Sequence, residues 1–418
     1  MTIKTVRVKN FKSFKEARVD LGKFNVLIGA NASGKSNFIR VIEFLRDIAR
    51  HGLDNAISLQ GGPEYLTNLN IGVHENLSLD IVLSEEPERG GPFIGSSKAG
   101  DSVLVLMPLQ VTYSFSISFS RKGAGFEIFD DRLVVNGNFH AFKGRARKLE
   151  SPQLLGPGEI LIIRDGEAMS VKTTPPEGVS LEEYEMMPWV LQQKVPRRAL
   201  ILERTPFLFG APLEDLAIYE FDPKLPKKAA PITGKAELEE DSSNLAIVLK
   251  RILENKGQKR KLANLLVDVL PFVTGLHVER VADKSLLLNL RETYTKKQYL
   301  PAFLISDGTI NTTALIVALY FEKKPVAIIE EPERNIHPYL ISKIVGMMKD
   351  ASQGKQIIVT THNPEVVRNA DISDILLVSR NGDGFSTISR PSEKEDVKVF
   401  LQNEMGLEEL FVQNLLHA

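Results

Sequence analysis

The feature that most constrains the fold is a glycine-rich loop between an apolar run and a helical pattern near the N-terminus. The loop reads GANASGKS over residues 29–36, and "FNVLIG" is a continuous apolar run that leads into it. After the loop, Phe38, Ile39, Ile42 and Leu45 recur at helical spacing. A continuous apolar run is typical of a buried strand, so the sequence predicts a strand, a loop and a helix in that order.

The residue types of this loop suit a bound phosphate. Glycines let the backbone wrap closely around phosphates, and the helix that follows adds partial positive charge. Lys35 is expected to reach the β- and γ-phosphates, and the Ser36 hydroxyl to ligate Mg²⁺. A chance match in a turn is the alternative, which the flanking strand and helix disfavour. We therefore expect nucleotide contacts from Gly29, Ala30, Asn31, Ala32, Ser33, Gly34, Lys35, Ser36 and Asn37.

A second apolar run ends in two acids. In "KKPVAIIEEPERNIHP", residues 326–329 are apolar and are followed by Glu330 and Glu331. The carboxyl end of a buried strand is where an α/β sheet places catalytic groups. Glu330 is expected to hold the Mg²⁺ shell, and Glu331 to position and polarise the attacking water. Neighbouring residues of a strand point opposite ways, so the two acids need not share a role. An ordinary acidic strand end is the alternative.

A polar triplet opens the helix predicted within "LISDGTINTTALIVALY". Ser306, Asp307 and Gly308 stand where that helix begins. A hydroxyl, a glycine and free helix amides make an anion site. A plain N-cap made by Ser306 or Asp307 is an equally good interpretation on local grounds.

A histidine follows another apolar strand. In "IIVTTHNPEVV" the run ends at Thr361, His362 and Asn363, and Pro364 begins a helix. A lone histidine is usually structural. At the end of a strand that follows the acidic strand, His362 could instead hydrogen-bond a γ-phosphate.

Composition excludes several other kinds of site. The chain has no cysteine, so disulfides, thiolate zinc sites and cysteine nucleophiles are excluded. Net charge is −1, so any contact with nucleic acid must come from local basic clusters: 143–148, 194–198 and 256–261. Solvated loop charge is the simpler interpretation of these clusters.

No apolar run is long enough for a membrane span or signal peptide, and we expect a cytoplasmic protein without a membrane partner.

Patterning along the chain predicts four parts. Residues 1–175 hold the loop and strands such as "TYSFSISFS" at 112–120, whose strict alternation predicts an antiparallel sheet. Residues 176–275 look irregular and then helical. Residues 276–392 read as a β-hairpin followed by alternating helices and strands, which predicts a parallel sheet covered by helices. Residues 393–418 read as a C-terminal helical segment that packs on its own domain or on a partner.

The four motifs, in this order, resemble the ABC-type ATPase heads of the SMC, RecF and OLD-like group. The opening "VRVKNFKSFKEARVDLGKFNVLIGANASGKSN" is similar to the start of many RecF-like proteins. "ISDGT" resembles the signature of that group, "IIEEPERNIHP" its acidic motif with the following D-loop, and "VTTHNPEVV" its switch-histidine loop. The fold implied is an α/β P-loop NTPase with a mixed sheet, an antiparallel β-rich lobe and a helical insertion.

The resemblance to this group implies a mechanism that no single motif would imply by itself. Two copies sandwich ATP and Mg²⁺, so that Ser306 and Gly308 of one copy contact the γ-phosphate bound by the other. Glu331 then acts as the base and His362 senses the γ-phosphate. A Q-loop glutamine is also implied, for which Gln60 in "SLQGGPEYL" is the candidate.

The sequence differs from the typical members of this group in several ways, and these differences narrow the expected function. From Lys35 to Ser306 is 306 − 35 = 271 residues, too long for a plain transporter ATPase and without the heptads of SMC arms. Asn311 stands where many relatives carry arginine, and no Toprim nuclease domain is expected after His362. A GTPase is disfavoured because the Asn-Lys-x-Asp motif is missing. Two hypotheses remain: an ATP-driven dimerising switch in DNA repair or anti-phage defence, which would act on DNA or a partner, and an ATP-binding oligomeric scaffold that holds or releases an effector, a toxin or nuclease.

Overall fold

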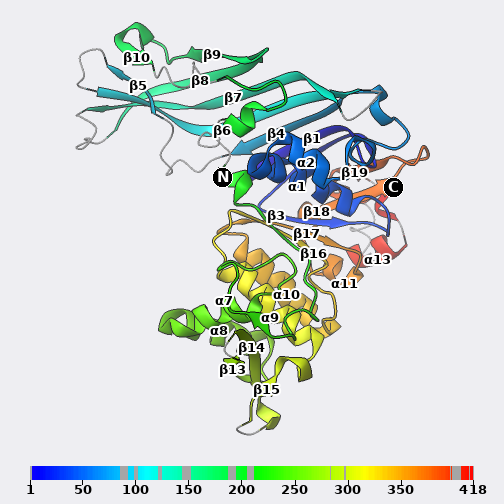
Figure 1. The fold of residues 1–418 in the computed structure, drawn as a ribbon. Coiled ribbons are helices and arrows are strands. Elements are labelled where there is room, and N and C mark those ends of the chain that lie inside the picture. The colour runs from blue at the N-terminus through cyan, green and yellow to red at the C-terminus, as the bar shows by residue number, and fades with distance from the viewer. Residues whose placement is uncertain are drawn as a thin grey trace. The chain divides into compact units, whose positions relative to one another are not determined.

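The chain forms two compact units, each built from segments that are distant in the sequence. The computed structural model describes residues 2–84, 93–97, 102–120, 125–143, 152–186, 194–204, 211–282, 284–295, 298–395, 397, 406–413 and 415–417. The first unit comprises Met1–Gly22, Asn37–Asp215 and Ser379–Ile388. The second comprises Lys23–Ser36, Leu216–Val378 and Ser389–Ala418. Figure 1 labels most of the helices and strands of both.

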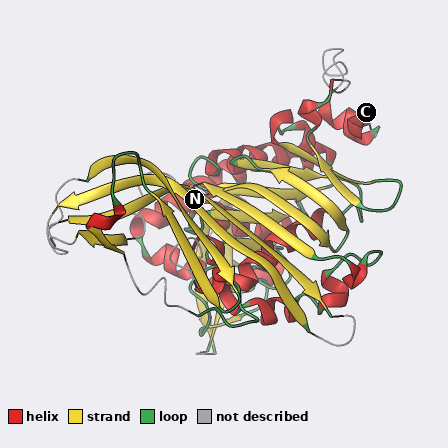
Figure 2. Ribbon diagram, turned by 90° about the horizontal axis from the view of Figure 1, so that it is seen from above, coloured by secondary structure: helices red, strands yellow, loops and turns green. Residues whose placement is uncertain are grey.

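An antiparallel sheet dominates the first unit. Its strand order is β2-β1-β4-β6-β7-β8-β9, with β5 beside β6 and β10 beside β5. Figure 2 shows the strands in yellow. Their bounds are β1 Thr2–Phe11, β2 Phe14–Asp20, β4 Leu77–Ser84, β5 Phe93–Ser97, β6 Ser102–Phe119, β7 Phe126–Lys143, β8 Gln153–Asp165, β9 Ala168–Thr174 and β10 Tyr184–Met186.

Alternation along β6 confirms the predicted half-buried strand. Tyr113, Phe115 and Ile117 are buried, and the serines between them are less so. Helix α1 (Lys35–His51) covers this face, since the ring of Phe44 contacts those of Phe11 and Phe115 at centroid distances of 5.8 and 6.5 Å. The shorter helices of the unit are α2 Leu53–Leu59, α3 Pro63–Leu66, α5 Ile201–Arg204 and α6 Ala211–Glu214, with 3-10 turns η1 Gly72–His74 and η2 Leu181–Glu183.

A sheet with a parallel core organises the second unit. Within this unit its order is β11-β16-β17-β3-β18, and the four pairs of neighbouring strands are parallel. The bounds are β3 Phe24–Ile28, β11 Ala217–Tyr219, β16 Val326–Glu330, β17 Gln356–Thr361 and β18 Ile375–Arg380. Most of β19 (Ser386–Ser389) belongs to the segment Ser379–Ile388 of the first unit. Strands β3 and β17 are buried along their whole length, as expected for strands covered on both faces.

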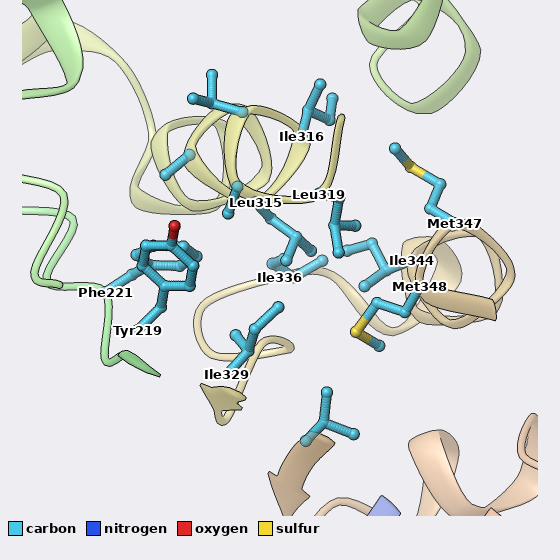
Figure 3. Packing of buried hydrophobic residues seen from close by; sticks show 14 of the residues in the cluster. Tyr219, Phe221, Leu315, Ile316, Leu319, Ile329, Ile336, Ile344, Met347 and Met348 are labelled. Carbon is cyan, nitrogen blue, oxygen red and sulfur yellow. The ribbon is translucent and has the colours of Figure 1, made fainter. Parts of the chain in front are cut away.

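Helices pack on this sheet around one apolar core. Leu315 and Leu319 of α9 (Asp307–Tyr320) meet Ile344 and Met348 of α10 (Pro338–Ala351), as Figure 3 shows, with Ile329 of β16 below them. The other helices are α7 Leu245–Glu254, α8 Lys256–Val269, α11 Pro364–Arg368 and α13 Leu407–Val412, with 3-10 turns η4 Thr293–Thr295, η5 Ala302–Leu304, η6 Ile372–Asp374, η7 Pro391–Glu393 and η8 Leu415–His417.

A small antiparallel sheet completes the second unit. Strands β13 (Val273–Val281) and β14 (Ser285–Glu292) form the hairpin that the sequence predicts, with β12 (Ala230–Pro231) and β15 (Leu300–Pro301) beside β14.

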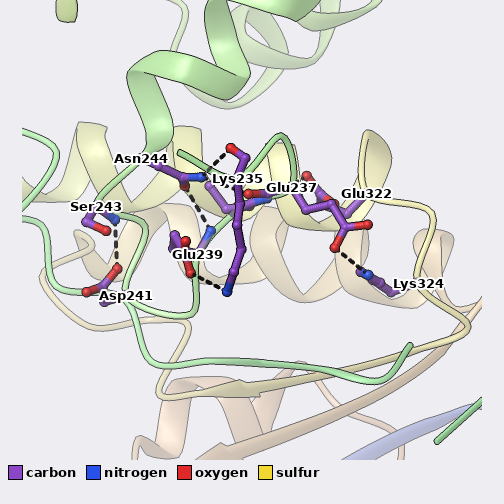
Figure 4. A network of polar contacts seen from close by, with 9 residues as sticks. Lys235, Glu237, Glu239, Asp241, Ser243, Asn244, Glu322 and Lys324 are labelled. Carbon is purple, nitrogen blue, oxygen red and sulfur yellow. Dashed lines mark hydrogen bonds and ion pairs between the residues drawn. The ribbon is translucent and has the colours of Figure 1, made fainter. Parts of the chain in front are cut away.

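Residues 235–244 lack regular structure but are held by side chains. The amide of Asn244 donates to the carbonyls of Glu237 (2.8 Å) and Lys235 (3.1 Å), and its oxygen accepts from the Glu239 N–H at 2.8 Å. Lys324 pairs with Glu237 at 2.7 Å (Figure 4). These bonds satisfy backbone groups that a helix or sheet would otherwise satisfy, so an irregular segment can pack tightly.

Several local predictions need correction. The basic residues 256–261, interpreted from the sequence as loop charge, belong to helix α8. A single residue, Asn255, separates α7 from α8, and its side chain caps α8 by accepting from the Gln258 N–H at 3.0 Å. The part predicted to be irregular contains β11, a strand of three residues.

At the C-terminus the structure describes α13, and Leu410 is buried in the second unit's core. Of the basic cluster 143–148, all but the first residue lie outside the described residues. In the described part of the chain, no helix is long and apolar enough to cross a bilayer.

Candidate functional site

The glycine-rich loop connects β3 to α1 and depends on glycine at two positions. A Cβ added to Gly29 would lie 2.2 Å from the carbonyl oxygen of Val378, so no larger residue fits without a shift of the backbone. Gly34 has a φ of 117°, a conformation that side chains rarely adopt. Ala32, with a φ of 62°, also lies in the left-handed region. The loop therefore has the backbone form that its sequence predicts.

Lys35 lies over its own loop. Its Nζ donates to the carbonyl oxygens of Gly29 at 2.7 Å and Ala30 at 3.0 Å. Burial lowers the pKa of Lys35, and the nearby carboxylates of Glu331 and Glu330 partly offset this. The lysine charge thus lies close to the acidic end of β16.

Parallel pairing brings three motifs to one edge of the sheet. Glu330 is paired in register with Thr360, and Thr361 with Ile28, the last residue before the loop. The Ser36 hydroxyl donates to Glu330 Oε2 at 2.9 Å, although 294 positions separate these residues. The structure therefore places the predicted metal ligands, Ser36 and Glu330, in direct contact.

The second acid points to a different partner. Glu331 has a φ of 45°, unusual for a residue other than glycine, and its N–H donates to the carbonyl of Thr360 at 3.0 Å. One of its carboxylate oxygens lies 2.8 Å from Nδ1 of His362. A strained residue held in this way is common where a side chain must be aimed precisely. Glu330 and Glu331 thus have separate partners.

The signature residues contact a neighbouring turn. Ser306 Oγ accepts from the Thr309 N–H at 3.2 Å, which is the N-cap of α9 that the sequence allowed as an alternative. Asp307 pairs with Lys227. A Cβ on Gly308 would lie 2.5 Å from the carbonyl oxygen of Asn335. Within one copy, none of the hydrogen bonds of Ser306, Asp307 and Gly308 in the described structure goes to the phosphate loop.

The turn after the acids contains a buried carboxyl group that none of the four motifs includes. Glu333 is 5% exposed and accepts a hydrogen bond from the Thr361 hydroxyl. Burial raises the pKa of Glu333. Asn311, buried in α9, donates to the carbonyl of Arg334 at 2.8 Å. His337 caps α10 by accepting from the Tyr339 N–H at 3.3 Å. Only the position of Glu333 two residues after Glu331 could have marked it in the sequence.

Comparison with known proteins identifies the family. Two family profiles match the chain: "AAA ATPase domain" over residues 1–86, and "AAA domain, putative AbiEii toxin, Type IV TA system" over residues 186–368. The fold is that of an Smc head solved with the C-winged helix domain of ScpA (16% identity, 93% of this chain and 97% of that one, TM-score 0.53). An Smc head from Pyrococcus furiosus, solved with the C-terminal domain of ScpA, is equally similar (15%, 96% and 99%, TM-score 0.52).

Two curated relatives cover shorter stretches. The DNA replication and repair protein RecF of Streptococcus agalactiae serotype Ia is 34% identical over 90 residues, which are 21% of this chain and 24% of RecF. An ATP/GTP phosphatase of Helicobacter pylori is 28% identical over 147 residues, 32% of this chain and 40% of that protein. The chain therefore matches less than half the length of either relative.

Together, the two ATPase profiles, the RecF similarity and the Smc-head fold support an ABC-type ATPase of the SMC and RecF group. The predicted fold is confirmed, since an α/β head with a P-loop, an antiparallel sheet and packed helices is what the Smc heads share with it.

Two further predicted contacts of this ABC-type ATPase lie in its first unit. Gln60 is buried, and its amide donates to Glu43 at 3.5 Å. Asn37 donates to the Ser13 hydroxyl at 2.7 Å. Both have partners within their own unit, and their nucleotide contacts stay predictions.

The basic clusters of this ABC-type ATPase differ in their surroundings. Arg197 pairs with Glu167 at 3.0 Å and Arg198 with Asp54 at 2.6 Å, so that cluster is largely neutralised. In the cluster at 256–261, all six residues are exposed on the first turns of α8. Of these two described clusters, the one at 256–261 therefore presents the more exposed positive charge.

Proposed function

We propose that this chain binds ATP with Mg²⁺ and hydrolyses it to ADP and phosphate, and that ATP drives two copies to close on each other. One observation carries the proposal: a single sheet edge gathers the phosphate loop, two acids with separate partners, and a histidine. The contact of Ser36 with Glu330 and that of Glu331 with His362 form two distinct functional pairs. An active ATPase needs one pair for the metal and another for the attacking water.

The donor set fits Mg²⁺. The hydroxyl of Ser36 and the carboxylate of Glu330 are hard oxygen ligands 2.9 Å apart. Among the described residues no group of three or more His, Asp or Glu side chains forms a metal cluster. Two protein ligands suit an ion that keeps waters and binds substrate phosphates. When bound, Mg²⁺ would neutralise phosphate charge.

The chain's own residues supply the remaining chemistry. Water attacks the γ-phosphorus, the bond from that phosphorus to the β–γ bridging oxygen breaks, and ADP leaves with the electron pair of that bond. Glu331 accepts the proton of the water, and His362, hydrogen-bonded to Glu331, fixes the direction of that carboxylate. Lys35 stabilises negative charge on the phosphates. General-base catalysis of this kind contributes roughly 10²- to 10⁴-fold in rate.

Closure of two copies would complete the site. Helix N-termini bind anions, and the N-terminus of α9 carries Ser306, Asp307 and Gly308. Within one copy these residues contact Lys227, Thr309 and the turn at Asn335 instead of the phosphate loop. We therefore assign them to the γ-phosphate bound by a second copy.

Two biological roles are compatible with such a switch. The similarity to RecF supports action on DNA in repair. The toxin–antitoxin wording of one family description, and the ScpA domains bound to the similar Smc heads, support anti-phage defence or a scaffold that holds a separate effector. A pull-down of the Glu331→Gln protein with ATP distinguishes these roles by whether DNA or protein is recovered.

Turnover and assembly together test the core proposal. Wild type should hydrolyse ATP only with Mg²⁺. Glu331→Gln should lose turnover yet keep ATP bound and elute as a dimer in size-exclusion chromatography with ATP. Glu254→Gln, at an exposed position of α7, is the control and should behave like wild type. A Glu331→Gln protein as active as wild type would remove Glu331 from its assigned role.

A further inference from the structure

A buried carboxyl group with an unsatisfied oxygen lies beside the proposed catalytic pair. Glu333 is 5% exposed, and its Oε1 accepts a hydrogen bond from the Thr361 hydroxyl. Its Oε2 is buried and has no hydrogen-bond partner among the described residues. Burying a carboxylate oxygen without a partner is unfavourable, so burial raises the pKa of Glu333. Stability alone thus does not account for a glutamate at this position.

The Thr361 hydroxyl connects Glu333 to the histidine loop. It donates to Glu333 and accepts from the Asn363 N–H at 2.9 Å. His362 lies between Thr361 and Asn363 in the chain, so this hydroxyl fixes the backbone on both sides of the histidine. Thr361 is itself fully buried, which keeps water from competing for these bonds.

The catalytic pair by itself is exposed. The side chains of His362 and Glu331 are 53% and 37% exposed. An exposed pair of this kind gains little from its own attraction and does not hold its geometry alone. The buried bond from Thr361 to Glu333 connects the same two backbone segments and can set their separation.

The turn that contains Glu333 also touches the start of α9. Asn311 donates to the Arg334 carbonyl at 2.8 Å, and Gly308 packs against the carbonyl of Asn335, which has a φ of 62°. One short turn therefore contacts the histidine loop through Glu333 and the signature helix through the next two residues.

We propose that Glu333 is a positioning residue: through its bond to Thr361 it holds His362 against Glu331, and through the turn 334–336 it connects that arrangement to the start of α9. The role in catalysis rests on the proposed hydrolysis of ATP. The arrangement of His362 does not, and it can be tested separately.

Steady-state kinetics of four variants test the role. Glu333→Ala and Thr361→Val should each lower kcat by about ten- to a hundredfold, because small displacements of positioned groups have effects of this size. KM for ATP and ATP affinity should stay unchanged, since neither residue bonds to Lys35 or Ser36. Glu333→Gln and Thr361→Ser should keep kcat within about twofold, because each keeps the acceptor or the donor of the bond. The double variant Glu333→Ala/Thr361→Val should be no slower than the slower single variant.

Glu322→Ala is the matched control. Glu322 is another buried glutamate of the second unit, 8% exposed, and it accepts from the Leu238 N–H at 2.9 Å outside the site. This variant should lose stability but not kcat per folded molecule. Additive losses in the double variant, or wild-type kcat in Glu333→Ala, would overturn the proposal. So would equal losses in Glu333→Ala and Glu333→Gln.

A spectroscopic readout does not depend on turnover. The chain has seven histidines, and the imidazole resonances of His362 can be assigned by comparison with His362→Gln. These resonances should shift in Glu333→Ala and Thr361→Val and stay in place in Glu333→Gln. If the His362 resonances shift in these variants but the wild-type protein does not hydrolyse ATP, the proposed function is wrong and the positioning role is still supported. Unshifted resonances in both variants would refute the positioning role.

Discussion

Nδ1 of His362 lies 2.8 Å from a carboxylate oxygen of Glu331, although 31 positions separate the two residues in the chain. They follow the adjacent parallel strands β17 and β16, whose carboxyl ends lie at the same edge of the sheet. Glu330, next to Glu331, is instead bonded to Ser36. The two neighbouring acids therefore have different chemical surroundings.

Lys35→Ala should lose nucleotide binding. Removing the ammonium group removes the positive charge that lies over the loop at Gly29 and Ala30. We expect ATP affinity to fall at least about tenfold, as for the loss of a charge-assisted hydrogen bond worth roughly 1.5–3 kcal/mol. Isothermal titration calorimetry measures this, with the exposed Lys323→Ala as control. Unchanged ATP affinity in Lys35→Ala would contradict the loop assignment.

Gly29→Ala should distort the loop. The added Cβ would approach the Val378 carbonyl oxygen to 2.2 Å, far inside contact distance, so the backbone must move. Both the melting temperature and ATP affinity should fall. Gly346→Ala on α10 is the control, because no atom lies within 4 Å of its added Cβ and the position is exposed. Alanine there should stabilise the helix by about 0.5–1 kcal/mol. Similar effects of the two substitutions would argue against a tight loop.

Ser306→Asp separates the two interpretations of the α9 N-terminus. Aspartate is as good an N-cap as serine, so the melting temperature should change little. If Ser306 faces a phosphate of a second copy, the new negative charge should abolish ATP-driven dimerisation. Sedimentation velocity with and without ATP, in the Glu331→Gln background, measures this. A Ser306→Asp protein that still dimerises with ATP would leave only the capping role.

Asp131 should make stability depend on pH. Burial raises its pKa to about 7, although the Ile201 N–H and the Tyr113 hydroxyl donate to it at 2.8 and 2.9 Å and Arg164 lies 3.9 Å away. The ordinary value, relevant to the unfolded chain, is about 3.9. The stability from this group is therefore complete below about pH 4 and is lost as pH rises towards 7.

Asp131→Asn should show this sign directly. Relative to wild type, the variant should gain on the order of 1–3 kcal/mol in free energy of unfolding between pH 5 and pH 8, because asparagine cannot ionise. Urea denaturation at the two pH values measures the gain, with the partly exposed Asp130→Asn as control. An Asp131→Asn difference that is the same at both pH values would show that the carboxyl group titrates normally.

Local patterns were enough to predict much of this molecule. The loop before α1, the apolar run ending in Glu330 and the alternation in β6 are all readable in short windows, because burial on one or both faces imposes its period on neighbouring residues. Strand β11 was missed because three residues carry too little pattern. Glu333 was not singled out because a buried carboxyl group and an exposed one look identical in a sequence.

The sequence by itself determined which residues carry phosphate, metal and base chemistry, since glycine, lysine, hydroxyl and carboxylate groups have those capacities wherever they stand. Only the tertiary structure decided which of them meet. The order β11-β16-β17-β3-β18 places Thr361 beside Ile28 and allows Ser36 to reach Glu330. Strand order is set by packing between segments hundreds of residues apart, and no short window of the chain contains that information.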